Sequence, residues 1–295
     1  MNTQLEGHNM SYNIVMFAYN EEANIVQSIE SIFNNTDLNL NRFYLIANGC
    51  TDNTIDIAQS TKSRLKFEKM TIKEITLGDK CNAWNTYIHD FSDEAQTHFF
   101  TDADVRFSEN CFSQMNTKLG QAPEETVVIA GMPLSGRNIE FYRELLTQRA
   151  CFFGNLYGVR QSFIDRIKST NFRLPVGLNW IDSFLTKAVN TDLSFGKDNL
   201  PQRTTWLEGV GYTFDSLSFL KKDDVKLYFS RIARYELGKL QEVYLDDLPL
   251  AQWPLDMIEI NKKIHASFAQ QTEQLSWFKT ILVRRRLNKI MSKYL

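Results

Sequence analysis

Residues 98–105 read His-Phe-Phe-Thr-Asp-Ala-Asp-Val, an apolar run that ends in two carboxylates, Asp102 and Asp104. In a strand, alternate side chains share a face, so these two carboxylates are expected to point the same way and to repel each other. A divalent cation removes that repulsion, and Mg²⁺ completes its shell with water and substrate phosphates. We therefore interpret the segment as a metal–diphosphate site. The competing interpretation is a solvated turn with two surface acids, because Asp-x-Asp is common by chance.

Length and composition narrow the class of protein. The chain has 295 residues, enough for one large α/β domain or for a domain with a C-terminal extension. A net charge of −2 provides no basic field for nucleic acid, so no nucleic-acid partner is expected. Residues 1–10 are polar and no segment is long enough to span a bilayer, so we expect neither signal peptide nor transmembrane helix. The four cysteines form no C-x-x-C pair, which predicts free thiols in a reducing cytosol.

Strand and helix patterns alternate through the first 130 residues. Residues 12–18 and 43–47 are apolar runs that predict strands, and apolar residues at helical spacing follow each of them. Asn20 is the expected N-cap of the first helix. Further elements are expected as a strand within 65–70 or 73–77, a helix over about 79–91, the strand ending at Asp102 and a strand at 127–130. The alternation predicts an α/β fold, with a mostly parallel central sheet and helices on both faces.

The second half is less regular. Residues 152–159 contain two glycines and predict an irregular or edge strand. Helices are expected to begin within 178–185 and to cover 228–244, with a strand at 206–214 between them. We expect one main domain, because no Pro/Gly-rich linker interrupts the chain.

The tail, residues 279–295, contains six basic residues and no acid. Its apolar residues recur at helical spacing: Val283, Leu287, Ile290, Met291 and Tyr294. A basic amphipathic helix of this kind can lie on an anionic membrane surface. It can equally dock on its own domain and leave a solvated basic face.

Polar clusters follow three of the predicted strands, at residues 19–22, 48–52 and 102–104. In parallel α/β sheets, ligands bind beyond the carboxyl ends of the strands. We therefore expect the three clusters to meet at one crevice, which favours the metal–diphosphate interpretation of the two aspartates.

Four ordered segments resemble the signatures of family 2 glycosyltransferases. They are Ala-Tyr-Asn-Glu-Glu at 18–22, Asn-Gly-Cys-Thr-Asp-Asn-Thr at 48–54, Lys-Cys-Asn-Ala-Trp-Asn at 80–85 and Thr-Asp-Ala-Asp at 101–104, and the resemblance covers roughly 12–190. It implies the Rossmann-like GT-A fold, a nucleotide-diphosphate sugar donor, a Mn²⁺ or Mg²⁺ cofactor and, usually, inversion at the anomeric carbon.

The resemblance also implies a division of the chain. A GT-A domain would cover residues 1–245, with a donor-binding half at about 12–107 and an acceptor-binding half at about 108–245. Residues 246–295 would form a C-terminal helical extension that carries the basic tail.

The same resemblance assigns roles around the donor. The implied donor-binding residues are Ala18, Tyr19, Glu21, Asn48, Asp52, Lys80 and Asp102. Asp104 would contact the cation most directly, with Asp102 nearer the ribose or bound through water. A cation there would stabilise the negative charge that the departing nucleoside diphosphate gains. The alternatives are a core role for Tyr19, a helix cap for Asp52 and an exposed lysine at Lys80. Asn48 replaces an acid common in relatives, which leaves the nucleobase open.

Inversion needs a base that removes the proton of the acceptor hydroxyl. Asp182 matches the family's carboxylate near the start of a later helix, although Ile181 stands where relatives often have an acid. A helix cap is the competing role for Asp182. Asp165 and Asp192 are weaker alternatives for the base.

Three other side chains complete the expected site. Trp180 can stack on an acceptor sugar or belong to the core. Arg231 and Arg234 resemble a basic helix that some relatives place beside the diphosphate.

The resulting hypothesis is a metal-dependent, inverting glycosyltransferase. It would transfer a sugar to a hydroxyl of a glycan or lipid-linked acceptor in cell-surface polysaccharide synthesis, in the cytoplasm or on the cytoplasmic membrane face. One alternative is a catalytically silent GT-A-like nucleotide-binding scaffold. A sugar-1-phosphate nucleotidyltransferase is disfavoured because residues 19–22 are acidic where that class has a Gly-rich basic loop. The chain has no G-x-G-x-x-G after its first strand, which disfavours a dehydrogenase. It also lacks the Gln-x-x-Arg-Trp motif of processive synthases, which argues against that class.

Overall fold

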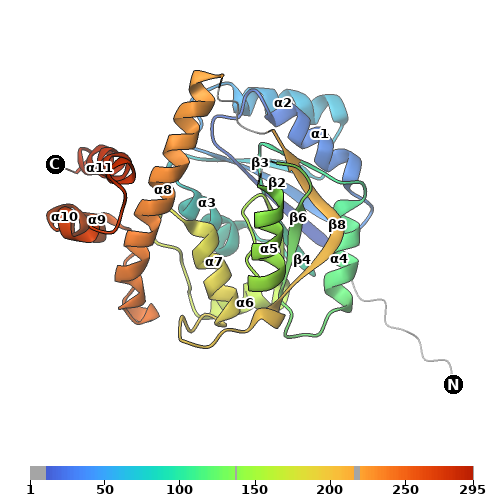
Figure 1. The fold of residues 1–295 in the computed structure, drawn as a ribbon. Coiled ribbons are helices and arrows are strands. Elements are labelled where there is room, and N and C mark those ends of the chain that lie inside the picture. Colours follow the sequence, from blue (N-terminus) through green and yellow to red (C-terminus); the bar gives the residue numbers. More distant parts are fainter. Residues whose placement is uncertain (1–10, 137, 216–219, 295) are drawn as a thin grey trace.

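The computed structural model describes residues 11–136, 138–215 and 220–294. Its centre is an eight-stranded sheet in the order β3-β2-β1-β4-β7-β6-β8-β5 (Figure 1). The strands are β1 (Tyr12–Ala18), β2 (Leu40–Asn48), β3 (Met70–Ile75), β4 (Thr97–Asp102), β5 (Val105–Phe107), β6 (Val128–Pro133), β7 (Leu156–Arg160) and β8 (Thr204–Phe214). The third strand, β3, therefore overlaps both of the ranges that the sequence offered for it, 65–70 and 73–77.

Helices connect and cover the strands. They are α1 (Ile25–Asn35), α2 (Thr54–Leu65), α3 (Lys80–Thr86) with a π turn (Tyr87–Phe91), α4 (Cys111–Gln121), α5 (Ile139–Arg149), α6 (Gln161–Ser169), α7 (Ile181–Asn190), α8 (Lys222–Asp246), α9 (Ile258–Ala266), α10 (Phe268–Gln271) and α11 (Trp277–Met291). Each helix that the sequence predicted is present. Cys50, Cys81, Cys111 and Cys151 are free thiols.

Parallel pairing holds throughout one half of the sheet, whereas in the other half it occurs between β6 and β8 but not between the other neighbours. Strands β3, β2, β1 and β4 are all parallel, as expected. Strand β7 runs antiparallel to both of its neighbours, β4 and β6, so the whole sheet is mixed. The expectation of an edge strand near residues 152–159 is wrong, because β7 is interior. A Cβ at Gly158 would lie 2.6 Å from the ring of Phe99, so this glycine permits close packing inside the sheet.

Two hydrophobic cores lie on opposite faces of the sheet. Ile14 and Met16 of β1 enter the core that α1, α2 and α4 cover. Val15 and Phe17 enter the other core, which contains residues of α3, α6 and α7. All seven residues of β1 are buried, because a parallel strand inside such a sheet is covered on both sides.

Helix α1 begins later than the sequence suggested. Asn20 adopts a left-handed backbone with φ 55°, which is incompatible with an N-cap followed directly by a helical turn. Its Oδ1 instead accepts a hydrogen bond of 2.8 Å from the backbone N–H of Thr51. Asn20 therefore ties the loop after β1 to the loop after β2.

The C-terminal helices form a separate layer. In Figure 1, α8 stands beside the sheet, and α9, α10 and α11 lie on its outer side. The apolar side chains Val283, Leu287 and Met291 of α11 are buried against the chain's own core. The predicted amphipathic helix is thus present, and its apolar stripe is docked on its own domain. Within the described residues, the helices are too short or too polar to cross a membrane.

Candidate active site

The turn between β4 and β5 carries the two aspartates. Asp102 is the last residue of β4, whereas Asp104 lies in the turn before β5, so strand alternation does not set their relative direction. The buried Ser28 hydroxyl donates a 2.7 Å hydrogen bond to the carbonyl of Ala103 and fixes this turn. Burial, together with the negative charge of Asp102, raises the pKa of Asp104. The two carboxylates are therefore close enough to repel each other, as the sequence predicted.

One oxygen of this pair has no partner. Asp104 Oδ1 is buried and receives no hydrogen bond. A buried carboxylate oxygen without a donor is costly unless a ligand binds it. A cation bound to this oxygen would remove that cost.

Lys80 and Arg231 bring positive charge to the pair. Lys80 Nζ lies 2.5 Å from Asp102 Oδ1, in a partly exposed ion pair. Burial alone would lower the pKa of Lys80, but Asp102 and Asp182 raise it, so its ammonium stays charged. The positive charge of Arg231, a residue of α8, lowers the pKa of Asp104 and so opposes the rise that burial causes.

Asp182 faces the same charges from the first turn of α7. Burial raises its pKa; Lys80 lowers it, and the charge of Asp102 raises it again. The backbone N–H of Gly154 donates to this carboxylate and Arg234 lies near it. The proposed base therefore lies in the same charged group as the Asp102–Lys80 pair. Asp182 is not the residue that caps α7, which is Trp180.

Gly154 is a site residue that the sequence reading missed. A Cβ on Gly154 would lie 2.6 Å from Lys80 Nζ and 2.7 Å from Asp182 Oδ1. A side chain at this point of the loop before β7 would therefore displace at least one of the two charged groups. The sequence shows Gly154 within an apolar segment, but it does not show that Lys80 and Asp182 lie beside this glycine.

Glu21 lies close to the aspartates as well. Its pKa is raised to about 7, mainly by burial, and the charges of Asp104, Asp102 and Asp52 add to the shift. Asn24 donates a 2.8 Å hydrogen bond to Glu21 Oε2 and holds it there. Acidic side chains from β1 and β4 therefore meet at one edge of the sheet.

Asn48 and Asp52 are engaged in holding loops. Asn48 is buried, and its Oδ1 accepts from the backbone N–H of Asp79. Asp52 accepts from the backbone and hydroxyl of Thr54 and from the N–H of Glu22. Burial alone would raise the pKa of Asp52, but these hydrogen bonds lower it. The residue at the N-cap of α2 is Asn53, so Asp52 is not the helix cap that the sequence offered, although it accepts hydrogen bonds from Thr54 at the start of that helix.

Asp79 joins the two halves of the site, which no sequence pattern indicated. Its Oδ1 accepts from the N–H of Asn82 and caps α3. Its Oδ2 accepts a 2.9 Å bond from the N–H of Gly177, in the segment that leads into α7. The start of α3, which carries Lys80, is thus held to the segment that leads into α7, which carries Asp182.

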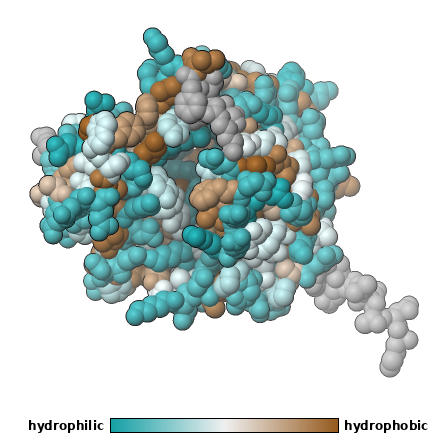
Figure 2. All heavy atoms as spheres, in the orientation of Figure 1, coloured by the Kyte–Doolittle hydropathy of each residue, from teal (hydrophilic) through white to brown (hydrophobic). Residues whose placement is uncertain are grey.

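The remaining expected residues lie on or against other elements. Tyr19 follows β1 and is 56% exposed, so it is not a core residue. Trp180 packs on Tyr235 of α8, with ring centroids 4.2 Å apart. Arg231 and Arg234 project from α8, which forms one wall of a hollow with hydrophilic lining in Figure 2. Burial and the charge of Arg231 lower the pKa of Arg234, whereas Asp102 and Asp182 raise it.

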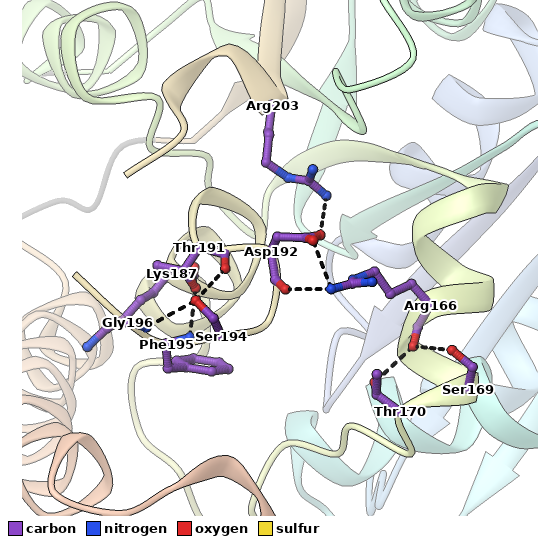
Figure 3. A network of polar contacts seen from close by, with 10 residues as sticks. All are labelled: Arg166, Ser169, Thr170, Lys187, Thr191, Asp192, Ser194, Phe195, Gly196 and Arg203. Carbon is purple, nitrogen blue, oxygen red and sulfur yellow. Dashed lines mark hydrogen bonds and ion pairs between the residues drawn. The ribbon is translucent and has the colours of Figure 1, made fainter. Parts of the chain in front are cut away.

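The weaker candidates for the base are engaged elsewhere. Figure 3 shows Asp192 between two guanidinium groups, with Arg203 at 2.7 Å and Arg166 at 2.8 Å. Asp192 follows the far end of α7, about 15 Å along the helix from Asp182. Asp165 is exposed on α6 and accepts from Gln161. Asp182 is therefore the carboxylate of the three that reaches the site.

The residues present fit a cation shared with a ligand. Among the described residues, no three His, Cys, Asp or Glu side chains are grouped as a complete metal site. Two carboxylates and an unpartnered Asp104 oxygen instead match a hard cation that takes its other ligands from phosphate oxygens and water.

Comparison with known families decides the classification. The family model described as Glycosyl transferase family 2 matches residues 13–177, more than half of the chain. The chain belongs to this family. A search among curated proteins found no match.

Solved structures share the fold. A mannosyltransferase from Pyrobaculum calidifontis, solved with GDP-Man and Mn²⁺, is 15% identical with a TM-score of 0.60, and the match covers 96% of this chain and 75% of that one. Glucosyl-3-phosphoglycerate synthase from Mycobacterium tuberculosis, solved with Mn²⁺, UDP and glucosyl-3-phosphoglycerate, is 15% identical with a TM-score of 0.53, and the match covers 77% of this chain and 79% of that one. The chain is a glycosyltransferase with the GT-A fold and C-terminal helices.

Proposed function

We propose that the chain transfers a sugar from a nucleotide-diphosphate donor, with inversion, to an acceptor hydroxyl that Asp182 deprotonates. The observation that carries this proposal is the buried, unpartnered Oδ1 of Asp104 within one charged cluster that also holds Asp182. The similar structures were solved with nucleotide sugars or nucleotides and Mn²⁺, which supports a donor and a cation of the same chemistry.

The cation site would use Asp104 directly and Asp102 directly or through water. When bound there, Mn²⁺ or Mg²⁺ would neutralise charge on the diphosphate. Lys80 contacts Asp102 and the charge of Arg231 acts on Asp104, and both side chains would hold the phosphates by charge-assisted hydrogen bonds. Ala18, Tyr19, Glu21, Asn48 and Asp52 remain the proposed surroundings of the nucleoside.

Asp182 would do the proton chemistry. As the acceptor oxygen forms its bond to the anomeric carbon, the bond from that carbon to the phosphate oxygen breaks, and the nucleoside diphosphate leaves with the electron pair. The acceptor proton passes to Asp182. Its raised pKa makes this carboxylate a stronger base than an exposed aspartate.

A role in surface glycan assembly at the cytoplasmic membrane face belongs to the same proposal. Trp277 and Ile281 of α11 are 76% and 41% exposed, next to the exposed Arg284 and Arg285. Aromatic and basic side chains of this kind suit an anionic membrane surface. Co-sedimentation with vesicles that contain phosphatidylglycerol tests this part, and equal binding to neutral vesicles at high salt would contradict it.

A donor panel tests the main proposal. UDP-, GDP- and dTDP-sugars would be screened for Mn²⁺-dependent thermal stabilisation and hydrolysis. We expect one nucleotide class to raise the melting temperature only with the cation and to be hydrolysed slowly. Stabilisation by a nucleoside diphosphate without turnover of any donor would favour the catalytically silent scaffold.

A further inference from the structure

Three aromatic rings outside both hydrophobic cores follow one another on α5 and on the loop before β7. Phe141 packs edge to face on Tyr142, with ring centroids 5.7 Å apart, and Tyr142 packs in the same way on Phe153 at 5.2 Å. Phe141 and Tyr142 are 56% and 38% exposed, and Phe153 is half-buried. Within the described residues, none of the three belongs to either core or packs against one. The cores of the fold therefore do not account for these rings.

The aromatic pair formed by Tyr142 and Phe153 adjoins the proposed base. Phe153 precedes Gly154, at which a Cβ would lie 2.7 Å from Asp182 Oδ1. Since neighbouring Cα atoms are about 3.8 Å apart, the Cα of Phe153 lies within about 8 Å of that oxygen. The buried Tyr212 of β8 lies near both: burial raises the pKa of its hydroxyl, and the charges of Asp182 and Tyr142 raise it further. The pair therefore borders the place at which an acceptor hydroxyl would meet Asp182.

The loop that carries Phe153 is fixed on both sides of this ring. The N–H of Phe152, which is buried, donates a 3.4 Å hydrogen bond to Thr186 Oγ1 of α7. The carbonyl of Asn155 accepts a 2.8 Å hydrogen bond from Thr101 of β4. Figure 2 shows apolar surface over α5, across the hollow from α8. The aromatic pair is therefore a fixed apolar surface beside this hollow, and a ligand bound on it would be oriented without a cost for ordering the loop.

Trp180, which the sequence offered for stacking on an acceptor sugar, is covered by α8. Its ring packs on Tyr235, and Lys239 Nζ lies 5.9 Å from the centroid of the same ring. A Cβ at Gly238 would lie 2.5 Å from Trp180 Cβ, so the helix lies directly against this residue. Tyr142 is the more accessible ring, because more than a third of its surface is exposed.

We infer that Tyr142 and Phe153 form a subsite that stacks on the pyranose ring of a carbohydrate acceptor. The inference rests on the proposed function and specifies its acceptor as a sugar. The axial C–H groups of a pyranose form an apolar face about as wide as one aromatic ring, and the negative face of the aromatic ring attracts them. The rings are flanked in the chain by Glu140 and Arg143, so the apolar surface is short. A short surface between polar side chains fits one sugar ring better than a long lipid chain.

Saturation-transfer difference NMR on the full chain tests the subsite. The probes are the methyl glycosides of glucose, galactose, mannose and N-acetylglucosamine, each titrated with and without Mn²⁺ and whichever of UDP or GDP binds. We expect saturable binding of at least one glycoside, with the strongest saturation on the axial hydrogens of one face of its ring. Tyr142→Ala should weaken this binding about fivefold or more, and Tyr142→Phe, which keeps the ring, should bind within about twofold of wild type.

Phe33→Ala is the matched control. Phe33 of α1 is also 38% exposed and packs edge to face on Phe67 at 5.1 Å, against the core that α1, α2 and α4 cover. This variant loses an equally exposed ring from the other face of the sheet, so it should bind the glycoside as wild type does. Thermal melting shows whether each variant is folded, and Tyr142→Leu, which keeps apolar volume without a ring, replaces an alanine variant that does not fold.

The remaining outcomes contradict the inference or the function on which it rests. The inference is overturned if no glycoside binds, if Tyr142→Ala binds as well as wild type, or if Phe33→Ala weakens binding equally. Tighter binding of farnesol than of any glycoside, lost in Tyr142→Ala, would assign the surface to a lipid chain and overturn the inference as well. Failure of UDP and GDP to bind would instead overturn the proposed function, and the glycosides alone would still judge the subsite.

Discussion

At the residue scale, Asp182 is distinguished from other acids by what surrounds it. Lys80, Asp102 and Arg234 all act on its carboxylate, and burial raises its pKa. Asp182→Asn keeps the shape and removes the base. We expect donor binding within about twofold of wild type and a loss of turnover of about 10²-fold or more. Initial rates and nucleotide affinities measure the two effects, and near-normal rates would assign the base to another group.

Gly154 makes a second prediction at this scale. In Gly154→Ala, the new Cβ would collide with the ends of the Lys80 and Asp182 side chains, which can move. We expect the unfolding free energy to change by less than about 1 kcal/mol, while turnover falls about 10-fold or more. Gly196→Ala is the control, since its Cβ would meet nothing closer than Ser194 Oγ at 3.3 Å. A fully active Gly154→Ala enzyme would contradict the close packing of the two charges.

The pH dependence of stability reports on Glu21. Its carboxyl has a folded-state pKa of about 7, above the ordinary value of 4.5, so the folded chain binds more protons than the unfolded chain between these two pH values. Its contribution to stability is therefore present at low pH and is lost as the pH rises toward 7. Buried His98, with a pKa of about 4, opposes this trend below pH 6.5.

The comparison of Glu21→Gln with wild type separates the contribution of Glu21 to the pH dependence from that of His98, which both proteins share. We expect the difference in unfolding free energy to change by about 2 kcal/mol in favour of the variant between pH 5 and pH 8. Chemical denaturation of metal-free protein at several pH values measures it. A difference independent of pH would show that Glu21 has an ordinary pKa.

At the scale of elements, α11 is held by its apolar stripe. Leu287 is 1% exposed and packs in the main core. Leu287→Ala should lower the unfolding free energy by about 2–4 kcal/mol. Ile281→Ala on the same helix, where the side chain is 41% exposed, should cost less than about 1 kcal/mol. Equal effects in urea denaturation would mean that the helix is not docked through Leu287.

The elements also show what the sequence could and could not predict. Apolar runs and helical spacing predicted β1, β2, β4 and the helices α1, α2, α3, α7, α8 and α11, because the period of the apolar residues follows which side chains are buried. Helices α4, α5, α6, α9 and α10 were not predicted. The place of β7 in the sheet was not predictable, because Gly158 reads as an edge signal until Phe99 is known to pack on it. The left-handed Asn20 was missed for the same reason, since Thr51, 31 residues away, stabilises it.

At the scale of the whole molecule, the site too was predictable from the sequence in part. Strand ends predicted where Glu21, Asp102 and Asp104 meet, because parallel strands finish at one edge. Asp79 and Gly154 were missed because their partners lie about 30 to 98 residues away and no short spacing encodes them. The two-half organisation that the family resemblance implies, with donor residues before 108 and acceptor residues after, stays a prediction.

The whole account depends on a cation held by Asp104 that joins the protein to a diphosphate. Calorimetric titration of a nucleoside diphosphate into wild type and Asp104→Ala, with and without Mn²⁺, tests this most directly. We predict that wild type binds only with Mn²⁺ and that Asp104→Ala, with an unchanged circular dichroism spectrum, does not bind in either condition. Equal binding by the two proteins, or binding by wild type that is indifferent to Mn²⁺, would contradict the account.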